Sequence, residues 1–287
     1  MNCESKKYRR IVVKIGSNVL TREDGRPDTT RISALVDQLA RLHRAGTEFI
    51  LVSSGAVASG RSLLETRVGR IDTVSARQLF SAVGQVKLLN RYYDLFNEYG
   101  IACGQVLTTK ESLSTRRQYL NQRNCMEAML AAGVVPIVNE NDTISVTELM
   151  FTDNDELSGL VAAGAEALVI LSNIDGIYDG SPSDPASQVI RRVAPGRDLS
   201  QYIDTARSSR GRGGMTTKSR ISSRAAGEGI EVVIANGRRD NILTDLILTD
   251  RDVVCTRFEA APRPASGVKK WIASSEGFAK GALHLDA

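Results

Sequence analysis

Residues 134–158 read VVPIVNENDTISVTELMFTDNDELS, an apolar run followed by a stretch crowded with acidic and amide side chains. The apolar run Val134–Val138 predicts a buried strand, and the small residues of Leu157–Ala165 predict a helix. In open α/β sheets, ligands bind outside the carboxyl ends of the strands. The stretch Asn139–Ser158 therefore predicts a ligand site on such a sheet.

The polar side chains of this stretch form two clusters, Asn139–Asp142 and Asp153–Asp155. Apolar residues alternate with polar ones between them, over Ile144–Phe151, which is typical of a short β-hairpin. A hairpin returns its two ends to one place, so we expect both clusters to meet in one pocket. The alternative is a pair of hydrated turns, because Asn and Asp favour turns. We favour the pocket because other loops of the chain supply groups that complement it.

Apolar, strand-like runs alternate with helical patterns along the whole chain. The predicted strands are Arg10–Lys14, Glu48–Val52, Cys103–Leu107, Val134–Val138, Ala167–Leu171, Ile230–Ile234 and Val253–Cys255. The predicted helices are Thr30–Arg44, Ser75–Tyr99, Thr115–Ala132, Asp155–Ala165, Met215–Gly227 and Asp240–Leu246. This alternation predicts an α/β fold with a mainly parallel sheet and helices on both faces. One long excursion, Ser181–Arg212, has the composition of a lid or binding loop.

Composition narrows the classes of function. The chain has 287 residues, 42% hydrophobic and 24% charged, with a formal net charge of +4, which suits a globular protein with small anionic substrates. The four cysteines form no C-x-x-C pair, so neither a zinc site nor a disulfide framework is expected, and we expect them to be buried and reduced. An apolar signal core and membrane-length apolar runs are both missing from the sequence. We therefore expect a cytoplasmic protein that binds neither a membrane nor nucleic acid.

Three further loops carry groups that suit a phosphate. Lys14 ends an apolar strand, where an ammonium group is costly unless it meets an anion, and Gly16 lets a ligand approach the backbone closely. The turn Ser53–Ala56 exposes backbone N–H groups in front of a helix. The glycine-rich Gly211–Gly214 precedes another helix, which contains Lys218.

One apparent phosphate motif is rejected. Gly55–Ser62 has the spacing of a P-loop, but Arg61 stands where that motif has the lysine that reaches the phosphates. Only the anion-binding turn is kept from this stretch.

Two lysines with glycine amides suit phosphoryl transfer, which depends on positioning and charge neutralisation. No general base accompanies them, since His43 and His284 lie far from every motif. A carboxylate acceptor such as a glutamate side chain, with an ordinary pKa of about 4.3, is already ionised at neutral pH and needs no base. A hydroxyl acceptor would call for one. The pattern therefore favours a kinase that acts on a carboxylate.

Six motifs occur in one order along the chain: VVKIGSNVL (Val12–Leu20), VSSGAVASG (Val52–Gly60), VNENDTIS (Val138–Ser145), TDNDELS (Thr152–Ser158), LSNIDGIY (Leu171–Tyr178) and GGMTTK (Gly213–Lys218). Together they resemble the amino acid kinase family, over Arg10–Trp271. The resemblance implies a three-layer αβα sandwich with a mainly parallel central sheet. It implies a kinase domain over residues 1–261, including a basic tail at 1–9. Residues 262–287 would be a linker or extension, without the PUA-type domain that many bacterial members carry.

The resemblance also implies roles for individual residues. Lys14 and Lys218 would flank the transferred phosphoryl group, and Asp155 would orient both lysines. The amino acid substrate would be bound by Ser54, Asp142 and Asn154, with Asp142 suited to an α-ammonium group. ATP, carrying Mg²⁺, would be bound by Lys14, Gly16, Ser172, Asn173, Gly211, Arg212, Gly213, Gly214, Met215, Thr216, Thr217 and Lys218. Two positions depart from the family pattern, which often has Asp at Asn173 and a small residue at Arg212.

The implied reaction is ATP-dependent phosphorylation of the side-chain carboxylate of L-glutamate to γ-glutamyl phosphate, the first step of proline biosynthesis. The resemblance further implies a homodimer or homotetramer, feedback inhibition by proline, and hand-over of the product to γ-glutamyl phosphate reductase. The alternatives are a sibling kinase for acetylglutamate, aspartate, carbamate or a nucleotide, the kinase part of a pyrroline-5-carboxylate synthase, and a silent regulatory module. Asp142 argues against acetylglutamate, which has no α-ammonium, and the retained lysines argue against a silent module.

Overall fold

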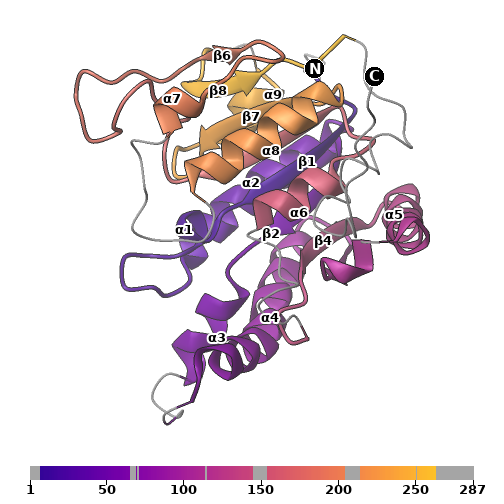
Figure 1. Ribbon diagram of the computed structural model, residues 1–287. Coiled ribbons are helices and arrows are strands. Elements are labelled where there is room, and N and C mark those ends of the chain that lie inside the picture. Colours follow the sequence, from indigo (N-terminus) through magenta and orange to yellow (C-terminus); the bar gives the residue numbers. More distant parts are fainter. Residues whose placement is uncertain are drawn as a thin grey trace, which may run out of the picture.

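The computed structural model describes residues 7–64, 69, 71–113, 115–144, 154–203, 214–249 and 251–262. Within these residues, one eight-stranded sheet has the strand order β3-β4-β2-β1-β5-β7-β8-β6 (Figure 1). Its strands are β1 (Arg10–Ile15), β2 (Glu48–Ser53), β3 (Cys103–Thr108), β4 (Val135–Glu140), β5 (Ala167–Ser172), β6 (Arg192–Val193), β7 (Glu231–Asn236) and β8 (Cys255–Phe258).

The sheet is mainly parallel, as the sequence predicted. Only β7 and β8 pair in the antiparallel sense among the described strands. The central strand β1 lies between β2 and β5, so that Lys14 is in register with Val52 on one side and Ile170 on the other. Residues 11–15 of β1 are all buried, which is the burial expected of a strand covered on both faces.

The helices that the structure describes are α1 (Ser17–Leu20), α2 (Thr29–Arg44), α3 (Ala56–Leu64), α4 (Thr73–Asn97), α5 (Arg116–Ala131), α6 (Asn154–Val161), α7 (Ser200–Ile203), α8 (Met215–Gly227) and α9 (Ile242–Ile247), with a 3-10 turn at Glu111–Leu113. Several begin at a side-chain cap. Asp28 accepts a hydrogen bond from the backbone of Arg31, and Asp72 accepts from Val74 and Ser75. Thr115 caps α5.

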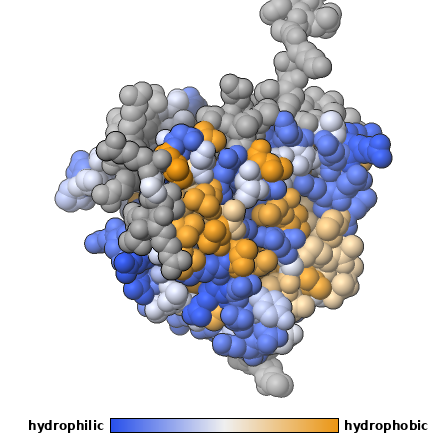
Figure 2. Space-filling view, turned by 90° about the horizontal axis from the view of Figure 1, so that it is seen from below, coloured by the Kyte–Doolittle hydropathy of each residue, from blue (hydrophilic) through white to orange (hydrophobic). Residues whose placement is uncertain are grey.

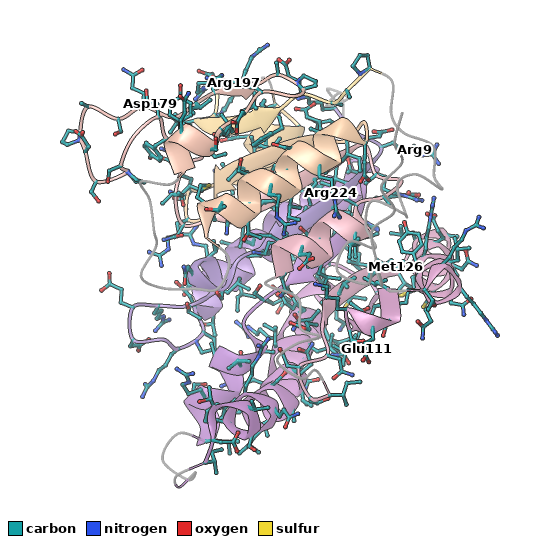
Figure 3. All side chains as sticks on the ribbon, in the orientation of Figure 1. Arg9, Glu111, Met126, Asp179, Arg197 and Arg224 are labelled. Carbon is teal, nitrogen blue, oxygen red and sulfur yellow. The ribbon has the colours of Figure 1, made fainter. Side chains whose placement is uncertain are left out.

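Two hydrophobic cores, one on each face of the sheet, make the molecule a three-layer αβα sandwich. Val13 and Ile15 pack with α2, α4 and α9 in the first core. Val12, whose side chain points to the opposite face, packs with α5, α6 and α8 in the second. Met126 of α5 and Arg224 of α8 lie on this second side of the molecule (Figure 3). The expected fold class is confirmed.

Helices α3 and α4 cross at glycines. A Cβ atom added to Gly84 would lie 1.8 Å from the backbone oxygen of Ala56, and one added to Gly60 would lie 1.8 Å from that of Phe80. Only glycine fits at these two positions, because a side chain would overlap the facing backbone. The pair projects from the lower end of the sheet in Figure 1 and carries one face of α4 to the end of β4.

Some expectations about the elements were wrong. Strand β4 continues to Glu140, so Asn139 and Glu140 are its last residues and do not follow it. The last strand is Cys255–Phe258, whereas Val253–Cys255 was predicted. The predicted excursion Ser181–Arg212 contains β6 and α7, and its residues 204–212 lie outside the described residues. The same holds for residues 145–151 of the predicted hairpin.

The cysteines differ from expectation too. Cys255 is buried and Cys103 is half-buried, but Cys125 on α5 is exposed. Among the residues that the structure describes, no helix is long and apolar enough to span a membrane.

Candidate active site

Three charged side chains from distant parts of the chain meet at the centre of the sheet. Lys14 Nζ lies 2.5 Å from Oδ1 of Asp155, and Lys218 Nζ lies 2.8 Å from Oδ2 of the same carboxylate. Asp155 is fully buried, and the two lysines are only 4% and 9% exposed. Two ammonium groups share one carboxylate, so the cluster carries excess positive charge. Such a cluster suits an anion such as a phosphoryl group.

The secondary structure explains how these groups meet. Lys14 is near the carboxyl end of β1, Asp155 lies in the first turn of α6, and Lys218 lies in the first turn of α8. Gly16 follows β1 directly, and its backbone N–H donates to the backbone oxygen of Leu171 at 3.0 Å. A Cβ atom at Gly16 would lie 3.7 Å from Lys14 Nζ, so glycine leaves the space beside this ammonium group open.

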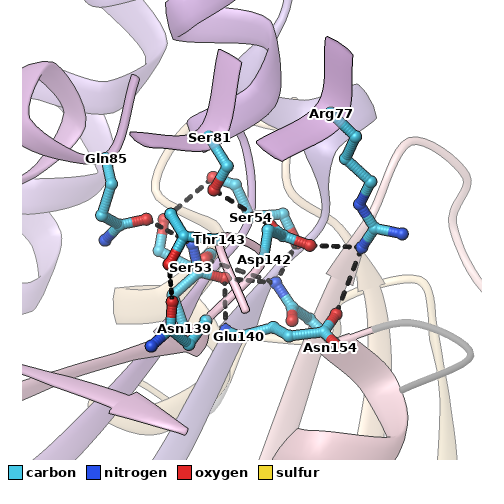
Figure 4. Close-up of polar contacts among 11 residues, drawn as sticks. Ser53, Ser54, Arg77, Ser81, Gln85, Asn139, Glu140, Asp142, Thr143 and Asn154 are labelled. Atoms are coloured by element: carbon cyan, nitrogen blue, oxygen red, sulfur yellow. Dashed lines mark hydrogen bonds and ion pairs between the residues drawn. The ribbon is translucent and has the colours of Figure 1, made fainter. Parts of the chain in front are cut away.

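A second polar cluster adjoins the first. Asn154, which precedes Asp155, donates through Nδ2 to Ser54 Oγ at 2.9 Å and to Asn139 Oδ1 at 2.9 Å (Figure 4). Asn139 donates in turn to Gln85 Oε1 of α4 at 2.8 Å. These bonds tie together the ends of β2 and β4, the start of α6 and one face of α4. The structure therefore brings into contact Ser54 and Asn154, which were both predicted to bind the amino acid substrate.

Asp142 is buried under α4. Its Oδ1 accepts a short hydrogen bond from Arg77 Nη2, and its Oδ2 accepts one from Ser81 Oγ at 3.3 Å (Figure 4). The same Arg77 nitrogen lies 3.3 Å from Glu140 Oε2. Gln85 follows Ser81 by one helical turn, so all three α4 side chains lie on one face of that helix.

Sequence reasoning missed these three α4 residues. The signal available was their spacing of four, Arg77, Ser81 and Gln85, inside a long helix that also carries other polar residues. Polar residues at that spacing are typical of a solvated helix face, and only the structure shows that this face covers the end of β4.

The residues predicted to bind ATP lie partly outside the described residues. Three of them, Gly211, Arg212 and Gly213, lie outside the described residues. Gly214 is the N-cap of α8, and Met215, Thr216, Thr217 and Lys218 form its first turn. On the other side of the sheet centre, Ser172 ends β5 and its hydroxyl lies 3.5 Å from Oδ1 of the exposed Asn173. Strand β5 pairs with β1, so Ser172 and Asn173 lie at the same edge of the sheet as the end of the strand that carries Lys14.

An ion pair fixes the loop after β5. Arg239 donates to both carboxylate oxygens of Asp175, from Nε at 2.7 Å and from Nη2 at 2.8 Å. These hydrogen bonds from Arg239 lower the pKa of Asp175 below its ordinary value. A bidentate pair of this kind holds the segment beside Asn173 against the turn after β7.

The described residues include no group of three or more His, Cys, Asp or Glu side chains arranged to hold a metal ion. Both oxygens of Asp155 face lysine ammonium groups, which leaves this carboxylate poorly suited to be a metal ligand.

Comparison with known proteins identifies the family of this chain. The sequence profile of the amino acid kinase family matches residues 9–236, and the chain belongs to that family. Its fold resembles that of an isopentenyl phosphate kinase in a crystal structure of its substrate complex, with a TM-score of 0.62 over 88% of this chain and 100% of the other, at 17% identity. That likeness concerns the fold alone.

Within the family, the chain groups with the glutamate 5-kinases, which are phosphotransferases. It is 66% identical over 281 residues to the glutamate 5-kinase of Bacteroides thetaiotaomicron, covering 97% of this chain and 78% of that one. Identity to the glutamate 5-kinase of Chlorobaculum tepidum is 44% over 282 residues, covering 97% and 76% of the two chains. For that of Shewanella woodyi it is 39% over 290 residues, covering 100% and 77%.

Proposed function

We propose that this chain transfers the γ-phosphoryl group of ATP to the side-chain carboxylate of L-glutamate and so forms γ-glutamyl phosphate, the first step of proline biosynthesis. The observation that carries the proposal is the buried bridge from Lys14 through Asp155 to Lys218. Membership of the glutamate 5-kinases at 66% identity supports the choice of substrate.

In the proposed mechanism, the two ammonium groups neutralise charge on the phosphoryl group as it moves between donor and acceptor. Asp155 holds Lys14 and Lys218 in place, since each carboxylate oxygen faces one of them. The acceptor carboxylate is ionised at neutral pH, so the reaction needs no base. Because the product is an acyl phosphate that water destroys, a site built from buried groups is an advantage.

The amino acid is assigned to the cluster beside the bridge. Ser54 and Asn154 are in direct contact, and Asn154 precedes Asp155, so the substrate would lie next to the phosphoryl group. Asp142 supplies a buried carboxylate for the α-ammonium group.

The nucleotide is assigned to the other side of the two lysines. Gly16, Ser172, Asn173 and the segment 211–218 would bind it, with the amide groups of the first turn of α8 directed toward phosphate oxygens. Mg²⁺ would arrive with ATP and neutralise phosphate charge. We place the kinase domain at residues 1–261 and the reaction in the cytoplasm.

We also propose a homo-oligomer, for which α4 offers surface. Leu79, Val86 and Tyr93 recur every seven residues on this helix and are 37%, 61% and 55% exposed. Figure 2 shows hydrophobic side chains gathered on the face that is seen from below. Exposed apolar surface of this kind is typical of protein contacts. Inhibition by proline at the glutamate pocket and hand-over of the product to γ-glutamyl phosphate reductase complete the proposal.

The test is an assay with L-glutamate, ATP and Mg²⁺ in which hydroxylamine traps the acyl phosphate as a hydroxamate. We expect ADP release and hydroxamate to rise together with L-glutamate and to be absent without it. The same assay with acetylglutamate, aspartate and bicarbonate with ammonia separates the sibling kinases. Activity on acetylglutamate and none on glutamate would refute the proposal.

A further inference from the structure

Asp142 already has a cationic partner in the protein. Its carboxylate is paired with the guanidinium group of Arg77, in an ion pair whose two side chains are 22% and 8% exposed. Ser81 donates to the other oxygen, so both oxygens of Asp142 are engaged from α4. An amino acid whose α-ammonium group approached Asp142 would meet the positive charge of Arg77 there.

An α-amino acid resolves this conflict because it brings its own negative charge. Its ammonium and carboxylate groups are both bonded to the same carbon atom, as a pair of opposite charges. Arg77 and Asp142 form the complementary pair. The same Arg77 nitrogen also lies 3.3 Å from Glu140, which remains beside the guanidinium group when Asp142 takes another partner. When the substrate enters, the exchange of partners leaves Asp142 with a cation and Arg77 with an anion, and it does not change the net charge of the site, so Asp142 is never left as an unpaired buried carboxylate.

We propose that Arg77 determines substrate specificity by receiving the α-carboxylate group while Asp142 receives the α-ammonium group. This inference rests on the proposed function, since it names the parts of the same substrate. The planar guanidinium fork matches a carboxylate through two parallel hydrogen bonds, and a lysine ammonium group does not. Arg77 is therefore a binding residue, and the phosphoryl transfer itself does not require it.

The position of Arg77 is fixed from several directions. The crossing of Gly84 and Ala56 holds α4 against α3. Gln85, two turns further along α4, accepts from Asn139, which is bonded to Asn154 beside Asp155. One continuous set of contacts thus sets the distance between Arg77 on α4 and the phosphoryl-transfer centre at Asp155. A clamp built in this way selects amino acids by the spacing between their α-carbon and their side-chain carboxylate.

The experiment compares Arg77→Gln with the wild-type enzyme on three ligands. L-Glutamate carries both α-groups, 4-aminobutanoate lacks the α-carboxylate, and glutarate lacks the α-ammonium. We expect Arg77→Gln to raise KM for L-glutamate and Ki for glutarate roughly 10- to 100-fold, the range of one charge-assisted hydrogen bond. Ki for 4-aminobutanoate should not rise, because the substitution removes a positive charge beside Asp142. KM for ATP and kcat at saturating glutamate should stay within about twofold of wild type.

The opposite pattern would overturn the inference. If Arg77 only positions Asp142, then Arg77→Gln raises Ki for 4-aminobutanoate and leaves Ki for glutarate as it was, because glutarate has no ammonium group for Asp142 to bind. Asp142→Asn should give that same pattern and serves as the comparison. Arg77→Lys keeps the charge without the fork, and we expect its KM for L-glutamate to lie between those of wild type and Arg77→Gln.

A control variant and the activity of the wild type separate other causes. Lys87→Gln removes a positive charge from an exposed site on α4, where the ammonium group donates to Ser62 Oγ at 3.5 Å, and it should leave the binding of all three ligands unaffected. If wild type turns over no L-glutamate, the proposed function has failed. If it does so normally and Arg77→Gln behaves like wild type, only the assignment of Arg77 has failed.

Discussion

Lys218, in the first turn of α8, lies 2.8 Å from the buried carboxylate of Asp155, in the first turn of α6. The two helices pack on the same face of the sheet, so the second core and the phosphoryl-transfer centre are built by the same elements. The Lys218 ammonium group is therefore held at the expected site of phosphoryl transfer by a packed helix, and its position does not depend on a surface loop.

Replacing Lys218 should stop phosphoryl transfer without abolishing the binding of glutamate. We expect Lys218→Ala to lower kcat by roughly 100- to 1,000-fold, the effect of removing one group that stabilises transition-state charge. Glutamate binding, measured by calorimetry, should stay largely intact, because Ser54 and Asn154 remain in contact. Unchanged turnover would show that Lys218 has no part in the transfer. Exposed Lys87→Ala provides the matched control.

Removing the shared carboxylate should affect stability as well as activity. Asp155→Asn leaves two nearly buried ammonium groups without their counter-charge. Loss of one partner of a buried ion pair costs about 3–5 kcal/mol, and we expect a decrease of that order in the free energy of unfolding measured with urea. Asp184→Asn, at an exposed turn, should change it little. Wild-type stability in Asp155→Asn would mean that the lysines find other partners.

The sequence was sufficient for the central pair of lysines because their signals are local. Lys14 stands at the end of an apolar strand, and a glycine-rich loop precedes Lys218. Neither pattern is usual in a segment that only connects two elements. The six motifs in one order then added Asp155. The ends of the strands were harder to predict. Asn139 and Glu140 are polar, so a prediction from hydrophobicity alone leaves them out of the strand. The ladder continues through them, pairing Leu107 with Asn139 and Thr108 with Glu140, because backbone hydrogen bonds do not depend on the side chain.

Arg77 could not be assigned from sequence for a different reason. Its partner Asp142 lies in the turn after β4, and the contact depends on how α4 lies across the end of β4. That placement follows from the crossing of α3 and α4 at Gly60 and Gly84, which is a tertiary property. From sequence alone, a glycine within a helix indicates only a weak helix former and says nothing about a helix crossing.

This crossing leads to a prediction on stability and binding together. Gly84→Ala places a methyl group where the backbone oxygen of Ala56 stands, so α4 must move away from α3. We expect a loss of about 1–3 kcal/mol in the free energy of unfolding, typical of overpacking, and a raised KM for L-glutamate because Ser81 and Gln85 shift with the helix. Steady-state kinetics and urea unfolding measure the two effects.

Gly227→Ala is the control for the glycine substitution. Nothing lies within 4 Å of a Cβ atom at Gly227, which is the last residue of α8. We expect it to be neutral or slightly stabilising, since alanine has the higher helix propensity. If Gly84→Ala proves equally harmless, the crossing is looser than the structure shows.

The ion pair after β5 gives a prediction on pH. Hydrogen bonds from Arg239 lower the pKa of Asp175 in the folded state, so the unfolded state binds its proton more readily as pH falls. The stabilisation is present above the unfolded pKa of about 3.9 and is lost as pH falls through the lower folded value. Because Arg239 is half exposed, water screens the pair and its contribution is at most about 1 kcal/mol.

The measurement is urea unfolding of wild type and Asp175→Asn at a series of pH values between 6 and 3. We expect wild type to be the more stable near pH 6 and the difference to shrink below pH 4, as protonation removes the charge that Arg239 binds. Arg239→Gln should abolish the same pH-dependent difference, because it removes the cause of the lowered pKa. A difference between wild type and Asp175→Asn that stays constant down to pH 3 would show that the carboxylate contributes through packing and not through its charge.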